Sequence, residues 1–118
     1  MTEPGRVEDG NILIRLSPIR RMGSGLLVPL HHLLAAPTGL MWIGSDPNCT
    51  LTVPDLEPYQ YVIRRLSDRS VAIQDSAGGG IRYQPPGHVH PQISNSVTVP
   101  VGSRVTVARY EIDVLAPF

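Results

Sequence analysis

Apolar and polar residues alternate through most of the chain, and this period of two limits the possible folds more than any other feature of the sequence. In an extended strand, successive side chains point to opposite faces, so such a segment has one apolar and one polar face. Twelve prolines and eleven glycines separate the alternating segments, and these residues end strands in turns. The clearest alternating segments are residues 12–16, 71–74, 97–101, 105–107 and 110–114. We therefore predict an all-β protein of many short antiparallel strands, either a sandwich or a barrel.

The length of the chain favours one folded unit. With 118 residues, it is long enough for one domain and short for two. We expect residues 1–10, which are polar, to form a flexible tail, and residues 11–118 to form the β domain. Residues 29–36, PLHHLLAA, could start a short helix with proline at its first position or form a strand and turn. Because Pro37 and Gly39 follow at once, we favour the strand and turn.

The charges and the single cysteine exclude several classes of protein. Ten arginines and no lysine balance ten acidic residues, so the chain lacks the basic excess typical of nucleic-acid binding. Cys49 has no second cysteine for a disulfide, which fits a reducing compartment. Residues 1–10 lack the order of a signal peptide, and prolines and histidines interrupt the longest apolar stretch, residues 25–42. We expect a cytoplasmic protein that binds neither nucleic acid nor membrane, and the exclusive use of arginine favours a GC-rich bacterial genome.

From Leu40 onward, the motifs follow one another in a distinctive order. They are a strand ending in Ile43-Gly44-Ser45, the segments 51–55 and 56–63, a strand ending in Asp75, the glycine-rich turn 76–80, the turn 101–105 and a last strand at 110–115. Over about two thirds of the chain, this order resembles that of the forkhead-associated (FHA) domain. The resemblance implies an eleven-stranded β-sandwich that recognises phosphothreonine peptides through loops at one end.

The residues at the expected phosphate site differ from the family pattern. Ser45 stands where the family has an arginine that supports the phosphate by charge-assisted hydrogen bonds. Glu57, Pro58 and Gln60 fall on the family's serine, arginine and histidine, and Gly79 replaces the asparagine that holds the peptide backbone. Ser45 is uncharged and Glu57 would repel a phosphate. We therefore predict an FHA-like antiparallel β-sandwich whose phosphothreonine pocket is degenerate.

The leading hypothesis is a non-catalytic interaction or scaffold module that binds a protein partner independently of phosphate. Loops at the end of a sandwich commonly carry function, although Asp, Asn and Gly are also ordinary turn formers. An apolar sheet face is the alternative surface, and an exposed sheet edge would allow self-association. No cofactor is expected. The candidate partner-binding residues are Ser45, Asp46, Asn48, Glu57, Tyr59, Gln60, Gly78, Gly79 and Gly80.

Two tyrosines and three arginines need separate interpretation. Tyr59 and Tyr61 lie two positions apart and would share one face of a strand; one would fill the core, and an exposed one would suit an interface. Arg64 and Arg65 would point to opposite faces, and we interpret both as surface residues. The second hypothesis is a phosphothreonine-peptide reader in which Arg64 or Arg82 replaces the lost arginine. Arg82, which follows the glycine turn, is the better candidate.

Motifs for catalysis and metal binding are weak. His88 and His90 would lie on one side of a strand at a spacing suited to a metal, and a small metalloenzyme that uses them is the third hypothesis. No acidic residue occurs in residues 91–95 and no histidine follows His90, so a polar loop is the ordinary interpretation. The glycine triplet lacks the lysine of a P-loop, and Cys49 belongs to no recognisable catalytic triad. We therefore expect no enzymatic activity and no bound metal.

Overall fold

The computed structural model describes residues 11–19, 28–34, 39–67 and 69–115, which form two packed β-sheets. Within these ranges the strands are β1 (Ile12–Pro18), β2 (Leu30–Leu34), β3 (Leu40–Gly44), β4 (Leu51–Thr52), β5 (Tyr61–Arg65), β6 (Ser70–Asp75), β7 (Ile81–Tyr83), β8 (Gln92–Ser94), β9 (Ser96–Pro100), β10 (Arg104–Val107) and β11 (Tyr110–Leu115).

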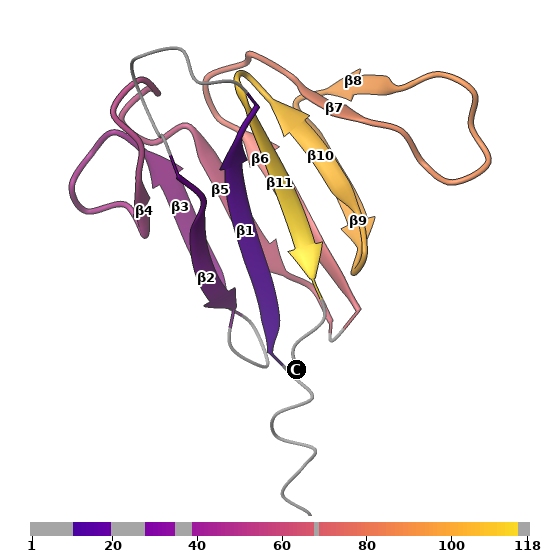
Figure 1. Ribbon diagram of the computed structural model, residues 1–118, viewed down its shortest axis with the longest axis horizontal. Helices are drawn as coiled ribbons and strands as arrows, with labels where there is room; N and C mark the ends of the chain where they lie inside the picture. The colour runs from indigo at the N-terminus through magenta and orange to yellow at the C-terminus, as the bar shows by residue number, and fades with distance from the viewer. Residues whose placement is uncertain (1–10, 20–27, 35–38, 68, 116–118) are drawn as a thin grey trace, which may run out of the picture.

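The strands are arranged as a sandwich of a six-stranded and a five-stranded sheet (Figure 1). The first has the order β2-β1-β11-β10-β7-β8, and the second has the order β4-β3-β5-β6-β9. Neighbouring strands pair antiparallel except β3 and β4, which run parallel. The predicted all-β antiparallel sandwich is thus confirmed, and the barrel alternative is wrong. Among the described residues, no helix has the length and apolar character needed to cross a membrane.

The inner faces of the two sheets share one apolar core. In β1, Ile12, Ile14 and Leu16 are completely buried, whereas Leu13 and Arg15 between them are only half-buried. The same alternation places apolar residues of the other strands in the core, and burying each such side chain contributes roughly 1.5–3 kcal/mol. The largest fully buried side chains elsewhere are Leu34, Met41, Ile43, Tyr61, Ile63, Ile73, Ile81, Tyr110 and Ile112.

Three strands of the five-stranded sheet meet their loops at the same end of the sandwich. Ile43 at the end of β3 pairs with Tyr61 at the start of β5, and Tyr61 pairs with Asp75 at the end of β6. We call this the apical end, and we call the opposite end, where Leu40 pairs with Arg64, the basal end. All nine partner-binding residues predicted from the sequence lie on the apical loops, which comprise residues 45–50, 53–60 and 76–80.

The ambiguous segment at residues 29–36 contains a strand. Leu30–Leu34 forms β2 at the edge of the six-stranded sheet, in agreement with the preferred interpretation. Residues 35 and 36 lie outside the described residues, as does the expected N-terminal tail at 1–10. The extent of the domain over residues 11–118 stays a prediction.

Candidate functional site

Gly44, the last residue of β3, lies directly against the β4–β5 loop. A methyl group at this position would lie 2.2 Å from the carbonyl oxygen of Pro58 and 2.7 Å from that of Glu57, so glycine is needed for the close approach. The amides of Ser45 and Asp46 donate to the Glu57 and Pro58 carbonyl oxygens at 3.0 and 3.1 Å. These main-chain contacts fix two apical loops relative to each other, and they bring Ser45 and Glu57 to neighbouring positions.

The loop that follows Ser45 is an internally bonded turn. The amide of Asn48 donates to the Asp46 carboxylate at 2.8 Å, and the amide of Cys49 donates to the Asp46 carbonyl oxygen at 2.9 Å. The buried Cys49 thiol donates to the Pro58 carbonyl oxygen at 3.1 Å. Burial, and secondarily the charge of Asp46, raises the pKa of this thiol. A thiol held in its neutral form is a poor nucleophile, so Cys49 has a structural role here.

An aromatic pair lies beside this turn. The rings of Trp42 and Tyr59 meet edge to face, with centroids 5.5 Å apart and planes at 89°, a geometry that stabilises aromatic contacts. Tyr59 is 41% exposed, whereas Tyr61 is buried in the core. Because β5 begins at Tyr61, the prediction that the two tyrosines share a strand face is wrong, but one does fill the core while the other is exposed. Partial burial, followed by a hydrogen bond with Asp46, raises the pKa of the Tyr59 hydroxyl.

Gln60, which the sequence resemblance aligns with the family's histidine, lies beneath the apical loops and contacts two of them. Its side chain is buried; the amide oxygen accepts from the Glu57 amide at 3.0 Å, and Nε2 donates to the Tyr61 hydroxyl at 3.1 Å. Its main-chain oxygen accepts from the Ser76 amide at 2.7 Å, and its own amide donates to Ile43. The structure therefore places this predicted contact residue beneath the surface, where it positions Glu57 and the start of the glycine turn.

A buried carboxylate fixes the glycine turn. Asp75 Oδ1 accepts from the amides of Ala77 and Gly78 at 2.9 and 3.1 Å, and Oδ2 accepts from the amide of Gly80 at 2.8 Å. Gly78 and Gly80 have φ values of 81° and 95°, which glycine adopts without strain. Burial, and then the charge of Asp75, raises the pKa of the nearby Tyr61 hydroxyl. The glycine-rich turn that the sequence predicted is therefore held by hydrogen bonds from its amides to the Asp75 side chain.

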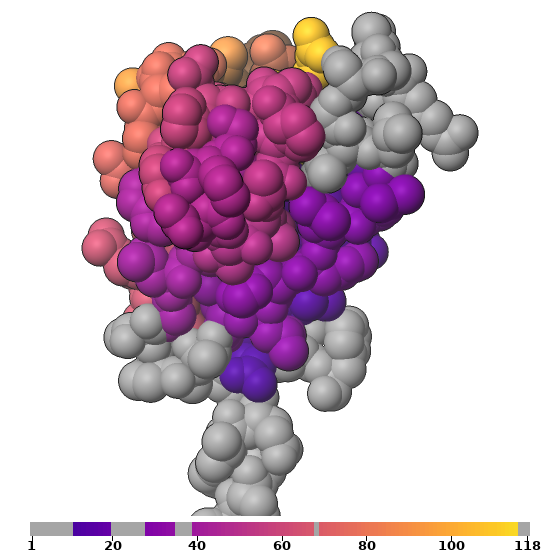
Figure 2. Space-filling view, turned by 90° about the vertical axis from the view of Figure 1, so that its left-hand side faces the viewer, coloured from indigo at the N-terminus to yellow at the C-terminus, as the bar shows by residue number. Residues whose placement is uncertain are grey.

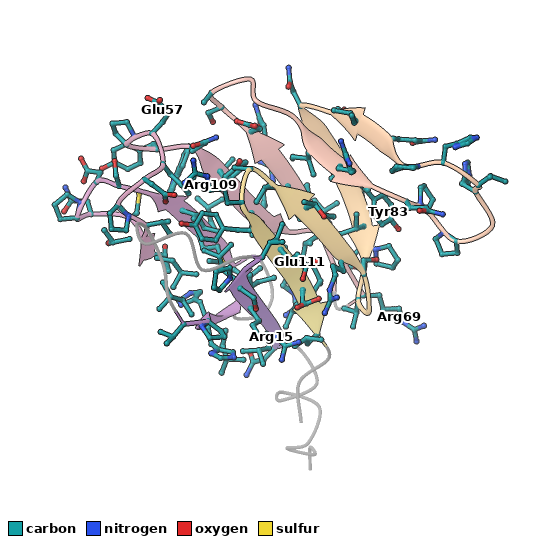
Figure 3. All side chains as sticks on the ribbon, turned by 45° about the horizontal axis from the view of Figure 1, so that its top comes forward. Arg15, Glu57, Arg69, Tyr83, Arg109 and Glu111 are labelled. Carbon is teal, nitrogen blue, oxygen red and sulfur yellow. The ribbon has the colours of Figure 1, made fainter. Side chains whose placement is uncertain are left out.

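The apical loops over the five-stranded sheet carry acidic side chains. The stretch from residue 45 to residue 60 contains Asp46, Asp55 and Glu57 but no arginine. Asp55 accepts from the Tyr110 hydroxyl at 2.5 Å and lies 3.8 Å from Arg109 on the β10–β11 turn. Glu57 is exposed and extends outward at the apical end, as Figure 3 shows. Figure 2 shows that this stretch, in magenta, covers one continuous part of the surface.

Three solved structures resemble this chain. The FHA domain of the CT664 protein from Chlamydia trachomatis matches with a TM-score of 0.62 at 17% sequence identity, covering 92% of this chain and 99% of that one. The fold is that of an FHA domain. A second structure, from a structural and functional analysis of phosphothreonine-dependent FHA domain interactions, has a TM-score of 0.55 at 15% identity, covering 87% of this chain and 95% of that one. The Slr1951 protein from Synechocystis sp. has a TM-score of 0.55 at 16% identity, covering 92% and 99%.

These likenesses show the FHA fold and confirm the resemblance found in the sequence. No protein-family model matches the chain, and no curated protein sequence matches it. Both results fit a divergent FHA-like chain.

The arginines considered as substitutes occupy different parts of the FHA-like sandwich. Arg64 is exposed near the basal end, about 10 Å along β5 from Tyr61 at the usual rise per residue. Arg82 is exposed on β7 of the other sheet, next to the glycine turn. The interpretation of Arg65 as a surface residue is wrong: it is buried, and its Nη1 donates to the Leu34 carbonyl oxygen at 3.4 Å. Adjacent residues of a strand face opposite sides, so only one of the two could reach solvent.

The two histidines of the metal hypothesis lie in a loop. His88 and His90 follow β7 and are exposed, and Gln84 Nε2 donates to the carbonyl oxygens of His88 and Val89 at 2.9 and 3.4 Å. The strand that would align their imidazoles is therefore not formed. Among the described residues, no group of three or more histidine, cysteine, aspartate or glutamate side chains is arranged to hold a metal ion.

Proposed function

We propose that this protein is a non-catalytic interaction module of the bacterial cytoplasm. It would bind a protein partner through its apical loops, without needing phosphate. The apical surface comprises Ser45, Asp46, Asn48, Glu57, Tyr59, Gly78, Gly79 and Gly80. One observation carries the proposal: the hydrogen bond between the Ser45 amide and the Glu57 carbonyl oxygen brings a neutral and an acidic residue together where the FHA resemblance implies phosphate contacts.

Electrostatics argue against a phosphate at this position. A phosphorylated side chain carries about −1.5 to −2 charges at pH 7 and is normally met by cations. Here it would meet Asp46 and Glu57, and like charges at short range are unfavourable. Arg109 on the β10–β11 turn already lies 3.8 Å from Asp55.

The stiffness of the loops supports protein binding. Gln60 beneath Glu57 and the Asp75 carboxylate within the glycine turn order the main chain before any partner arrives. A surface that is ordered in advance loses less entropy on binding. Tyr59, packed edge-on against Trp42, offers the kind of rigid aromatic side chain that commonly dominates binding energy.

The proposal is tested with peptides selected from a random display library against the purified protein. Each selected peptide that contains serine or threonine is synthesised with and without phosphate, and both affinities are measured by calorimetry. We expect the two affinities to agree within about threefold, and we expect Tyr59→Ala to weaken binding by about tenfold or more. Arg69→Ala, an exposed change on the β5–β6 loop at the basal end, serves as the control and should change nothing. A preference of about tenfold or more for phosphorylated peptides would contradict the proposal.

A phosphothreonine-peptide reader remains the second candidate, and one observation favours it. Arg82 lies beside the glycine turn and makes no ion pair with a described residue. If the protein recognises phosphothreonine through Arg82, phosphopeptides would bind at least about tenfold more tightly than their unphosphorylated forms, and Arg82→Gln would remove the difference. Arg64, near the basal end, is poorly placed for the same role.

A further inference from the structure

The outer surface of the six-stranded sheet is hollowed next to the glycine turn. A pocket of about 260 Å³ is lined by Gly79, Gly80, Arg82, Ile93, Thr106 and Ala108. Arg82 on β7 pairs with Thr106 on β10 on one side and with Ile93 on β8 on the other, so the three side chains lie in a row across the sheet. The pocket thus combines one guanidinium, one hydroxyl group and one apolar wall.

Arg82 differs from the other arginines of this sheet face in its partners. Arg15 and Arg104 both contact the buried carboxylate of Asp113, at 3.2 and 2.7 Å, and Arg104 also lies 3.6 Å from Glu111. Within the described part of the chain, Arg82 has no such counter-ion. Its positive charge is therefore available to a group from outside.

The buried carboxylate of Asp75 does not neutralise Arg82. Asp75 lies on the inner side of the glycine turn, and both of its oxygens accept hydrogen bonds from main-chain amides. Among residues 77–80, Gly79 alone donates no amide hydrogen bond to a described residue. Gly79 also lines the pocket, so its amide is a candidate second donor for a ligand there.

Backbone conformation shapes the rim of the pocket. A methyl group on Gly80 would lie 3.0 Å from Cγ2 of Ile93, so glycine lets this apolar wall sit close to the turn. Ala108 on the opposite rim has φ of 49°, a left-handed conformation that costs a residue with a side chain roughly 1 kcal/mol. This conformation belongs to the β10–β11 turn, because Val107 pairs with Tyr110 and a two-residue hairpin turn has a positive φ at its first residue.

We propose that this pocket binds the side-chain carboxylate of a glutamate or aspartate in the partner protein. Arg82 would hold the carboxylate through two parallel hydrogen bonds, a geometry to which the guanidinium is well matched. Thr106 and the Gly79 amide supply further donors, and Ile93 contacts the methylene groups of the acidic side chain. The inference rests on the proposed function, and it extends the partner's contact area from the apical loops over the glycine turn onto the six-stranded sheet.

Charge and size favour a carboxylate over other ligands. One arginine balances one carboxylate, whereas a phosphate of about −1.5 to −2 charges calls for further cations, and the lining residues supply none. The volume of about 260 Å³ lies below the roughly 300–1,000 Å³ of pockets that enclose whole small molecules. The pocket therefore fits a single side chain.

The test uses the isotope-labelled protein and three small probes, followed by amide NMR spectra. The probes are N-acetylglutamate N-methylamide, its neutral glutamine counterpart, and N-acetylphosphothreonine N-methylamide. We expect the glutamate probe to give saturable shifts at Gly79, Gly80 and Thr106, and the glutamine probe to bind about tenfold more weakly or not measurably. Arg82→Gln should abolish the shifts, Thr106→Val should weaken them, and Arg64→Gln, the matched exposed control, should leave them unchanged.

Each contrary outcome overturns the assignment. Absence of saturable shifts with the glutamate probe, or shifts that persist in Arg82→Gln, excludes carboxylate binding in this pocket. Binding of the phosphothreonine probe about tenfold more tightly than the glutamate probe at the same residues would make the pocket a phosphate reader instead. The NMR experiment with small probes and the peptide-affinity experiment with Tyr59→Ala are independent. If the probes do not bind the pocket, the peptide result still tests the proposed function. If Tyr59→Ala does not weaken peptide binding, the probe result still tests the pocket.

Discussion

The contact between Gly44 and the β4–β5 loop leads to a quantitative prediction for Gly44→Ala. The new methyl group would start 2.2 Å from the Pro58 carbonyl oxygen, and an ordinary contact needs at least 3.4 Å, so the loop must move by about 1.2 Å. Such a movement breaks three hydrogen bonds, from the Ser45 amide, the Asp46 amide and the Cys49 thiol. At about 0.5–1.5 kcal/mol each, the loss in the free energy of unfolding is about 2–4 kcal/mol.

Urea unfolding followed by tryptophan fluorescence measures this loss, because Trp42, the single tryptophan, lies on the same strand as Gly44. With a slope of about 1–3 kcal/mol per molar urea, the midpoint should fall by roughly 0.7–4 M. Gly78→Ala is the matched control: φ there is 81° and no neighbouring atom lies within 4 Å, so only the backbone cost of roughly 1 kcal/mol applies. If Gly44→Ala destabilises the protein no more than Gly78→Ala does, the close approach of the loop is refuted.

Three further changes test the interior of the site. Asp75→Ala removes the acceptor of three main-chain amides and should lower the free energy of unfolding by about 2–4 kcal/mol, with faster hydrogen exchange at Gly78; unchanged exchange would contradict the anchoring role. Ala108→Gly should raise the free energy of unfolding by about 1 kcal/mol, as measured by thermal unfolding. A decrease in stability would show that the φ of 49° at Ala108 is not strained. Because the pKa of Tyr61 is raised, the native state keeps a proton that the unfolded state loses above the ordinary value of 10.0, so the free energy of unfolding should fall as the pH rises past about 10. Urea unfolding at pH 9 and pH 11 measures this fall in the wild type and in Tyr61→Phe. A smaller fall in Tyr61→Phe supports the prediction, and an identical fall contradicts it.

The sequence predicted the strands well because their alternation reflects a local property of the chain. Residues such as Ile12 and Ile14 face the core in the register that the period of two indicates. The pair Tyr59 and Tyr61 was misplaced because the period holds only inside a strand, and β5 begins at the second of them. Arg65 was misassigned for a related reason: its strand position directs it inward, and this overrides the general preference of arginine for the surface.

The candidate site was only partly predictable. Composition and the FHA resemblance pointed to the apical loops, but the Trp42–Tyr59 contact and the packing of Gly44 against Pro58 join residues far apart in the sequence. The sequence shows that residue 42 is a tryptophan, but no sequence pattern around it indicates that its ring contacts Tyr59. The pocket at Arg82 depends on the register of three strands, which a single sequence does not contain.

The main-chain hydrogen bonds between the apical loops also affect how the sequence of this protein can change during evolution. Ser45 holds the β4–β5 loop through its main-chain amide, so this hydrogen bond does not depend on the side chain that residue 45 carries. A substitution at residue 45 can therefore alter the side chains that the apical end presents while the main-chain framework of the FHA fold is kept.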